Sequence, residues 1–179
     1  MRRKPVIAVS QCLLGEPVRY DGTDKNATAL VETLERAVRF IPICPEVEAG
    51  FGVPRPPMRV EKAEDEAKRL IVIESRRDQT DAMNSYAGRK VKELYEGGID
   101  GMVLKARSPS CGKASGLYSK RGDLVGTTPG FFVMEVRNVA PRLPIADEDE
   151  LSDAAAIMTF LERVHQYAAQ RLGTSIGRR

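Results

Sequence analysis

The residues with the most specific chemistry in this sequence are its three cysteines, Cys12, Cys44 and Cys111. An odd number of cysteines cannot form a complete set of disulfide bonds. Three thiolates suit either a zinc ion that also binds a water molecule or an iron–sulfur cluster that keeps one iron without a cysteine. The spacing leaves both metals open, although the absence of a CxxC pair argues against a zinc ribbon.

Polar and turn-forming residues surround each cysteine, which is unusual for an inert buried thiol. The segments 10–15, 44–46 and 108–112 all contain glycine, proline or serine beside the cysteine. Cations occur in the same stretches of chain. Because positive charge favours the thiolate, we expect these cations to activate the cysteines; they are Arg19, Arg55, Lys105, Arg107 and Lys113.

A few other side chains are candidates for catalysis. Glu46 lies two residues after Cys44 and is the best acid–base candidate. Ser108 and Ser110 can donate hydrogen bonds to a substrate or to a sulfur atom, and each also suits a turn cap. The single histidine, His165, is expected on the surface or in packing, so a histidine-based zinc hydrolase or a Ser–His–Asp triad has little support.

The cysteines follow apolar segments that are typical of buried strands. Cys12 comes after Val6–Val9, Cys44 directly follows Phe40–Ile43, and Cys111 lies in the loop after residues 99–104. In an open parallel sheet, ligands bind outside the carboxyl ends of the strands. The three cysteines are therefore expected to meet at one edge of the sheet.

Helical periodicity alternates with these strands and predicts a single compact Rossmann-like α/β domain, with a mostly parallel central sheet flanked by helices. This domain is expected over residues 1–172, followed by a flexible tail at 173–179. Residues 70–73 are expected to form half of a hairpin beside the main sheet, and 143–145 a last short strand. Irregular loops are predicted over 45–69 and 105–126, and helices over 27–38, 78–96, 128–136 and 151–172.

Composition places the chain among ordinary globular proteins. It has 179 residues, of which 42% are hydrophobic and 30% charged. A net charge of +3 gives no support for a nucleic-acid partner such as tRNA. No apolar run is long enough for a signal peptide or a membrane span, so a cytoplasmic location without a membrane partner is expected. The oligomeric state is not readable from the sequence.

Three segments together resemble a known family, the thiouracil desulfidases, long labelled a domain of unknown function. Residues 10–22 carry the pattern S-x-C-L-x-G-x-x-V-R-Y-D-G. The second segment is Cys44-Pro45-Glu46, followed by Gly50, Pro54 and Arg55-Pro56. The third is K-x-x-S-P-S-C-G at 105–112. The resemblance extends from about Pro5 to the terminal helix.

This resemblance implies a 4Fe–4S cluster held by Cys12, Cys44 and Cys111. It implies that the free iron binds the sulfur of a thiolated uracil, and that C=S is replaced by C=O without redox chemistry and with release of sulfide. The catalytic glutamate and serine of the family would be Glu46 and Ser108. The substrate is expected to be a small thiolated base or nucleoside; the candidate substrate contacts are Ser10, Arg19, Arg55, Lys105 and Ser110.

Two other classes of function remain open at this point. One is a binding protein that carries a cluster or sulfur for another enzyme, for example in tRNA thiolation. The carboxylate of Glu46 beside Cys44 favours an enzyme over such a carrier. The other is a zinc-dependent hydrolase or deaminase, which the lack of an HxE or CxxC signature disfavours.

Overall fold

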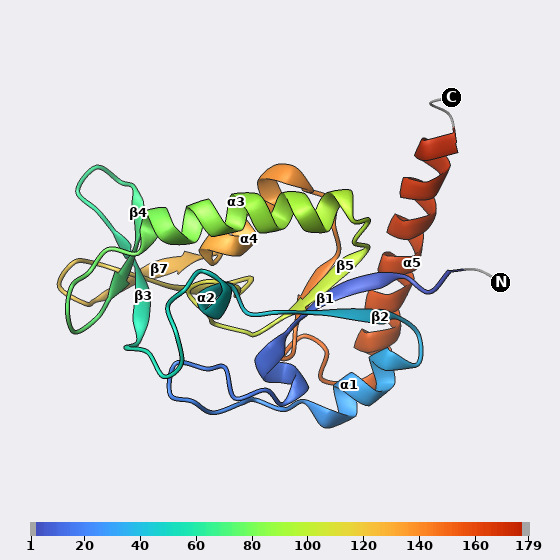
Figure 1. The fold of residues 1–179 in the computed structure, drawn as a ribbon, viewed down its shortest axis with the longest axis horizontal. Helices are drawn as coiled ribbons and strands as arrows, with labels where there is room; N and C mark the ends of the chain where they lie inside the picture. The colour runs from blue at the N-terminus through green and yellow to red at the C-terminus, as the bar shows by residue number, and fades with distance from the viewer. Residues whose placement is uncertain (1–2, 177–179) are drawn as a thin grey trace.

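The computed structural model describes residues 3–176 and is built around a parallel four-stranded sheet. The strand order is β2-β1-β5-β8, and every neighbouring pair is parallel (Figure 1). The strands are β1 (Val6–Ser10), β2 (Arg39–Ile43), β5 (Gly101–Leu104) and β8 (Ile145–Asp147). Pro42 lies on β2, which is an edge strand, as expected for a residue without a backbone donor.

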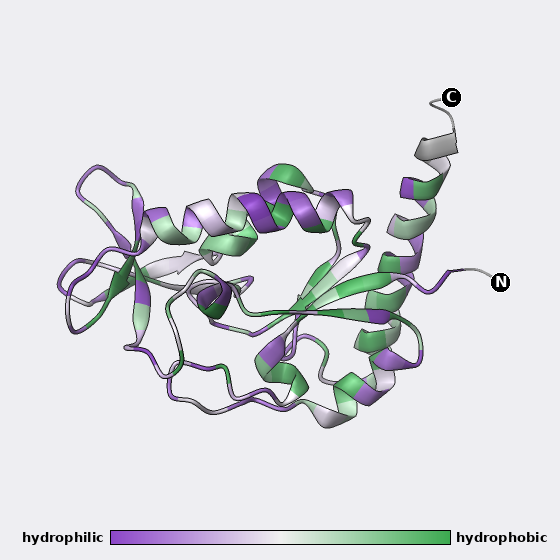
Figure 2. Cartoon of the chain, viewed as in Figure 1, coloured by the Kyte–Doolittle hydropathy of each residue, from purple (hydrophilic) through white to green (hydrophobic). Residues whose placement is uncertain are grey.

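Side chains alternate across this sheet and so feed two separate layers of the core. Ile7 and Val9 of β1 pack with helices α1 (Thr28–Glu35) and α5 (Ala154–Ile176). Ala8 points to the other face and packs in the core with α3 (Thr80–Glu96) and α4 (Phe131–Val139). Figure 2 shows the hydrophobic β1 and β5 enclosed between these helices. The predicted α/β fold with a parallel sheet flanked by helices is confirmed.

A second, mixed sheet of order β4-β3-β6-β7 lies beside the first (Figure 1). Its strands β3 (Met58–Lys62) and β4 (Lys68–Val72) form the hairpin expected near residue 70. The expectation of irregular structure at 105–126 is wrong in part, since this stretch contains β6 (Ser115–Tyr118) and β7 (Leu124–Thr128). Both strands have little apolar alternation, and most of β7 is exposed, so the sequence carried no strand signal there.

The terminal helix is attached to the sheet by a buried carboxylate. Asp100 is fully buried and accepts hydrogen bonds from Val6 N–H, Arg3 and Arg171. Helix α5 continues to Ile176, so the predicted tail at 173–179 begins inside a helix, and its last three residues lie outside the described part. His165 is exposed on this helix. No helix among the described residues is long and apolar enough to cross a membrane.

Candidate functional site

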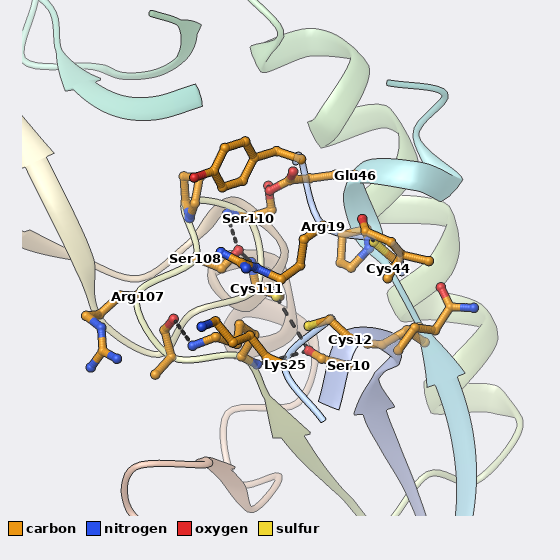
Figure 3. A pocket seen from close by; sticks show the side chains of 18 of the residues that line it. Ser10, Cys12, Arg19, Lys25, Cys44, Glu46, Arg107, Ser108, Ser110 and Cys111 are labelled. Atoms are coloured by element: carbon orange, nitrogen blue, oxygen red, sulfur yellow. Dashed lines mark hydrogen bonds between the residues drawn. The ribbon is translucent and has the colours of Figure 1, made fainter. Parts of the chain in front are cut away.

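The order of the main sheet creates the site. From β1 the chain leads first to β2 on one side and later to β5 on the other, so the carboxyl end of β1 is a topological switch point where ligands commonly bind. Cys12 follows β1 on a short 3-10 helix (Gln11–Leu14), Cys44 follows β2, and Cys111 lies in the loop after β5. All three cysteines line one cavity of about 330 Å³ (Figure 3).

Local backbone geometry holds Cys44 and Cys12 in place. Cys44 caps the short helix α2 (Pro45–Glu48), and its N–H donates to the Glu48 Oε1 atom at 3.0 Å. Pro45 suits the first helical position because it has no N–H to satisfy there. The 3-10 helix of Cys12 ends at Gly15, whose φ of 89° favours glycine.

The Cys111 loop, residues 105–114 between β5 and β6, is folded tightly against the start of helix α4. Phe132 N–H donates to Ser110 O at 2.9 Å, and Gly130 N–H donates to Gly112 O at 2.9 Å. A side chain at Gly112 would place its Cβ 2.7 Å from Ser108 O, and one at Gly130 would place it 2.4 Å from Ser110 O. Both glycines are therefore required for this close approach; only proximity in space, not the sequence pattern, identifies Gly130.

Glu46 faces the same cavity with both carboxylate oxygens engaged. Ser110 Oγ donates to Glu46 Oε1 at 2.8 Å, and Arg55 Nε donates to Glu46 Oε2 at 2.6 Å. Glu46 and Arg55 are both buried, at 9% and 8% exposure, and Ser110 is fully buried. A buried ion pair with good hydrogen-bond geometry holds the carboxylate in one orientation.

Arg55 also joins the two loops that border the cavity. Its Nη1 atom donates to Val18 O at 3.0 Å and to Gly52 O at 2.9 Å, while its backbone N–H donates to Tyr20 O at 2.8 Å. Arg55, a predicted substrate contact, therefore has its guanidinium bound by protein groups. We infer that Arg55 orients Glu46 and the loop at 18–20.

The two predicted serines near Cys111 have different surroundings. Ser108 Oγ accepts N–H groups from Ser110 at 3.3 Å and Cys111 at 3.2 Å, which is the turn-capping arrangement expected of a loop serine. Ser10 is buried at the end of β1, with its Oγ atom 3.6 Å from Cys111 Sγ.

Burial dominates the protonation of the thiols. It raises the pKa of Cys12 to about 12, with added repulsion from Cys111 and Cys44, and it raises the pKa of Cys111 to about 11 despite hydrogen bonds from Ser108 and Ser10. Burial also raises the pKa of Cys44. The mutual repulsion shows that the three sulfurs share one electrostatic environment.

Lys105 lowers the pKa of Cys12 and Arg55 lowers the pKa of Cys44, as expected of nearby cations, but burial outweighs both effects. Most of these cations are paired with acids that lie far from them in the sequence. In addition to Arg55 with Glu46, a run of acidic residues after β8 pairs with the Cys111 loop; the pairs are Lys105–Glu148, Arg107–Asp149 and Lys113–Glu150. Their positive charge is neutralised locally, so it does not offset the burial of the thiols.

The structure adds two residues to the cavity that the sequence did not single out, Lys25 and Tyr20. No ion pair of Lys25 is found within residues 3–176, and its backbone N–H donates to Cys12 O at 2.8 Å. Tyr20 is 42% exposed, and the Arg19 guanidinium lies 5.5 Å from the centre of its ring. The only signal in the sequence that pointed to Tyr20 as a site residue was its position in the first motif, residues 10–22.

The donor set fits an iron–sulfur cluster. Within residues 3–176, no three histidine, cysteine or acidic side chains are placed to bind a single metal ion. A cubane cluster has a different requirement, because each cysteine binds a different iron and the sulfurs need only surround a common space. Three unpaired cysteines around one cavity meet that requirement.

Comparison with known proteins gives consistent matches. The model of the family described as 2-thiouracil desulfurase matches residues 7–148. The 4Fe-4S-dependent thiouracil desulfidase TudS has a similar structure, with a TM-score of 0.66 and 32% sequence identity, over 87% of this chain and 99% of TudS. "Uncharacterized protein YbbK" of Bacillus subtilis (strain 168) is 31% identical over 111 residues, 60% of this chain and 73% of that protein.

Proposed function

This chain belongs to the 2-thiouracil desulfurase family, and we propose that it is a 4Fe–4S-dependent desulfidase that converts the C=S group of a thiouracil-like base to C=O. The main support is the arrangement of three cysteines and one buried carboxylate, Glu46, around a single cavity. The similar structure of TudS, a 4Fe-4S-dependent thiouracil desulfidase, supports the same reaction.

Cys12, Cys44 and Cys111 would hold the cluster. With three protein ligands, such a cluster keeps one iron available as a Lewis acid for a soft substrate atom such as sulfur. Burial of the thiols favours their neutral forms, so metal binding must displace their protons during assembly.

Glu46 acts as the general base in this proposal. Arg55 and Ser110 hold its carboxylate in one orientation in the cavity, where it can take a proton from a water molecule that attacks the C=S carbon. The net reaction is C=S + H₂O → C=O + H₂S, which needs no oxidant or reductant. The water supplies the oxygen, and its two hydrogens leave with the sulfur.

Ser108 is proposed to position the water or to pass a proton. Its oxygen accepts two backbone N–H groups, and its hydroxyl also bonds to the Cys111 thiol at the cavity wall. Arg19 and Lys105 are kept as proposed substrate contacts, and Lys25 joins them because its ammonium group has no acidic partner in the described part of the chain. The partner is then a small thiolated base or nucleoside.

A reducing compartment suits this chemistry. All three cysteines are unpaired, and they would be lost as ligands if they were oxidised. We therefore propose a cytoplasmic location.

The decisive experiment is anaerobic reconstitution of the cluster, followed by measurement of sulfide release from a panel of thiolated pyrimidines. Stoichiometric iron with repeated turnover is the expected result. A reconstituted protein that binds a cluster but releases no sulfide from any of them would instead support the carrier function. Zinc without iron after anaerobic purification would contradict both.

A further inference from the structure

Ser10 connects two parts of the site that are far apart in the sequence. It is the last residue of β1 and is only 2% exposed. Its Oγ atom accepts the backbone N–H of Lys105, the first residue after β5, at 3.0 Å. The same atom lies 3.6 Å from Cys111 Sγ (Figure 3). One hydroxyl group therefore contacts both the end of the neighbouring strand and one of the three cysteines.

The positions of the hydrogen atoms decide which of Ser10 Oγ and Cys111 Sγ donates the hydrogen bond. A cysteine that binds iron has no S–H and can only accept a hydrogen bond. The Ser10 oxygen uses one lone pair for Lys105 N–H, which directs its own hydrogen away from that donor. The hydroxyl must then be the donor to Cys111 Sγ.

We propose that Ser10 is a positioning residue that donates an O–H···S hydrogen bond to Cys111 when this cysteine ligates the cluster. The inference rests on the proposed function. Such a bond fixes the Cys111 side chain and withdraws negative charge from the sulfur. Hydrogen bonds to cluster sulfurs and ligands tune the reduction potential and strengthen metal retention. In this proposal Ser10 supports the cluster. Because Ser10 is buried and its hydroxyl is bound to Lys105 and Cys111, this role takes the place of the substrate contact expected from the sequence.

The position of Ser10 makes this effect local to the cluster. Cys12 follows Ser10 by two residues, and Cys111 belongs to the loop that begins at Lys105. The bonds from Ser10 to Lys105 and Cys111 thus fix the Cys12 and Cys111 segments relative to each other. Loss of the hydroxyl would loosen this relation without removing a ligand.

The test compares Ser10→Ala with Ser115→Ala. Ser115 is also buried and belongs to the strand after the Cys111 loop, but its hydroxyl donates to Arg107 O and is not bonded to a cysteine. Both variants and the wild type are reconstituted anaerobically. The cluster reduction potential is then measured by a titration followed by electron paramagnetic resonance, and iron loss is followed with a chelator.

For Ser10→Ala we expect a more negative potential and iron loss about 10-fold faster than in the wild type, the lower end of the usual effect of residues that support metal ligands. Ser115→Ala is expected to behave as the wild type. An unchanged potential and unchanged iron loss in Ser10→Ala would overturn the inference while leaving the proposed function in place. A wild type that holds no cluster would overturn both.

A measurement on the wild type keeps the inference testable if Ser10→Ala does not fold. Exchange of H₂O for D₂O replaces the Ser10 hydroxyl hydrogen, so the Fe–S(Cys) stretching bands of the reconstituted protein should shift. Bands that are identical in the two solvents would contradict a hydrogen bond from a hydroxyl group to the ligand sulfur.

Discussion

At the residue scale, the site combines three thiols with one buried, paired carboxylate. The same burial that raises the pKa of Cys12 and Cys111 surrounds Glu46, yet Glu46 has a guanidinium at 2.6 Å and a hydroxyl at 2.8 Å. Burial favours neutral groups unless a partner compensates for lost hydration. Arg55 pairs directly with Glu46, whereas for Cys44 it lowers the pKa without outweighing burial.

Glu46→Gln should retain the cluster and lose turnover. The amide keeps the size of the side chain but cannot take a proton, and a general base contributes about 10²- to 10⁴-fold to a rate. Iron content and sulfide release from a thiolated pyrimidine are measured on the same sample. Full activity in this variant would remove Glu46 from the mechanism.

Cys111→Ala should bind iron poorly because a proposed ligand is lost. Iron and acid-labile sulfide per chain are measured after anaerobic reconstitution, together with circular dichroism to check the fold. Normal iron content in a folded variant would show that Cys111 is not a ligand.

At the element scale, the Cys111 loop depends on the segment that follows β8. Glu148 contacts this loop twice, through Lys105 Nζ and through the Ala106 N–H group, to which its Oε2 atom lies at 2.7 Å. Asp149 and Glu150 continue the pairing along the loop with Arg107 and Lys113. The acidic segment thus restrains the loop that carries both Cys111 and Ser108.

Glu148→Gln should increase hydrogen exchange of the backbone amides in residues 105–113. The neutral amide weakens the interaction with Lys105 and provides only one oxygen, so the loop opens more often. Exchange measured by mass spectrometry checks this. Glu162→Gln on the exposed side of α5 is the matched control and should leave the loop unchanged. Equal exchange in both variants would contradict the restraint.

The β3–β4 hairpin contains another buried carboxylate, Glu61. Burial by itself raises the pKa of Glu61, but hydrogen bonds from Arg76 and Arg59 outweigh burial and hold this pKa below its ordinary value of 4.5. A group with a lowered pKa in the folded state stabilises the protein above its unfolded-state pKa, and this contribution is lost as the pH falls through the folded-state pKa.

Glu61→Gln should therefore reduce the free energy of unfolding by about 1–3 kcal/mol at pH 7, the usual range for a lost charged hydrogen-bond partner. The difference from the wild type should shrink as the pH falls below about 4.5. Urea unfolding at several pH values measures both effects. Glu64→Gln is the control, since that side chain is 94% exposed and 3.9 Å from Lys120, and a constant difference at all pH values would contradict the assignment.

At the scale of the whole molecule, the two sheets share one hydrophobic core. Val60 and Leu70 of the second sheet pack in the same cluster as Ala8 and Met102 of the main sheet. Phe132 of helix α4 is fully buried in that cluster. A shared core couples the stability of the two sheets, which supports the proposal of a single folding unit over residues 1–172.

The whole chain should then unfold in one cooperative transition. Far-ultraviolet circular dichroism, which follows the helices, and tyrosine fluorescence, which includes Tyr118 of β6 and Tyr86 of α3, should give coincident urea curves. Two separate transitions would show that the second sheet folds independently.

The two central strands of the main sheet could be predicted from the sequence because they are buried on both faces. Residues 6–9 and Gly101–Leu104 are continuous apolar runs, which are typical of buried parallel strands. The β6–β7 part of the second sheet could not be predicted, because Leu124–Thr128 is exposed and its pairing depends on a partner strand rather than on its own composition.

For the site, the sequence was enough to predict which residues would carry the proposed chemistry. Cysteines after strand ends and a glutamate beside Cys44 are local features, and the order of a parallel sheet brings strand ends together. Their electrostatic surroundings became visible only in the folded chain. Glu148 contacts Lys105 and Ser10 contacts Cys111 across long sequence separations, and Arg55 folds back on Glu46 nine residues earlier. Charge and hydrogen bonding depend on distance in space, and the sequence does not contain those distances.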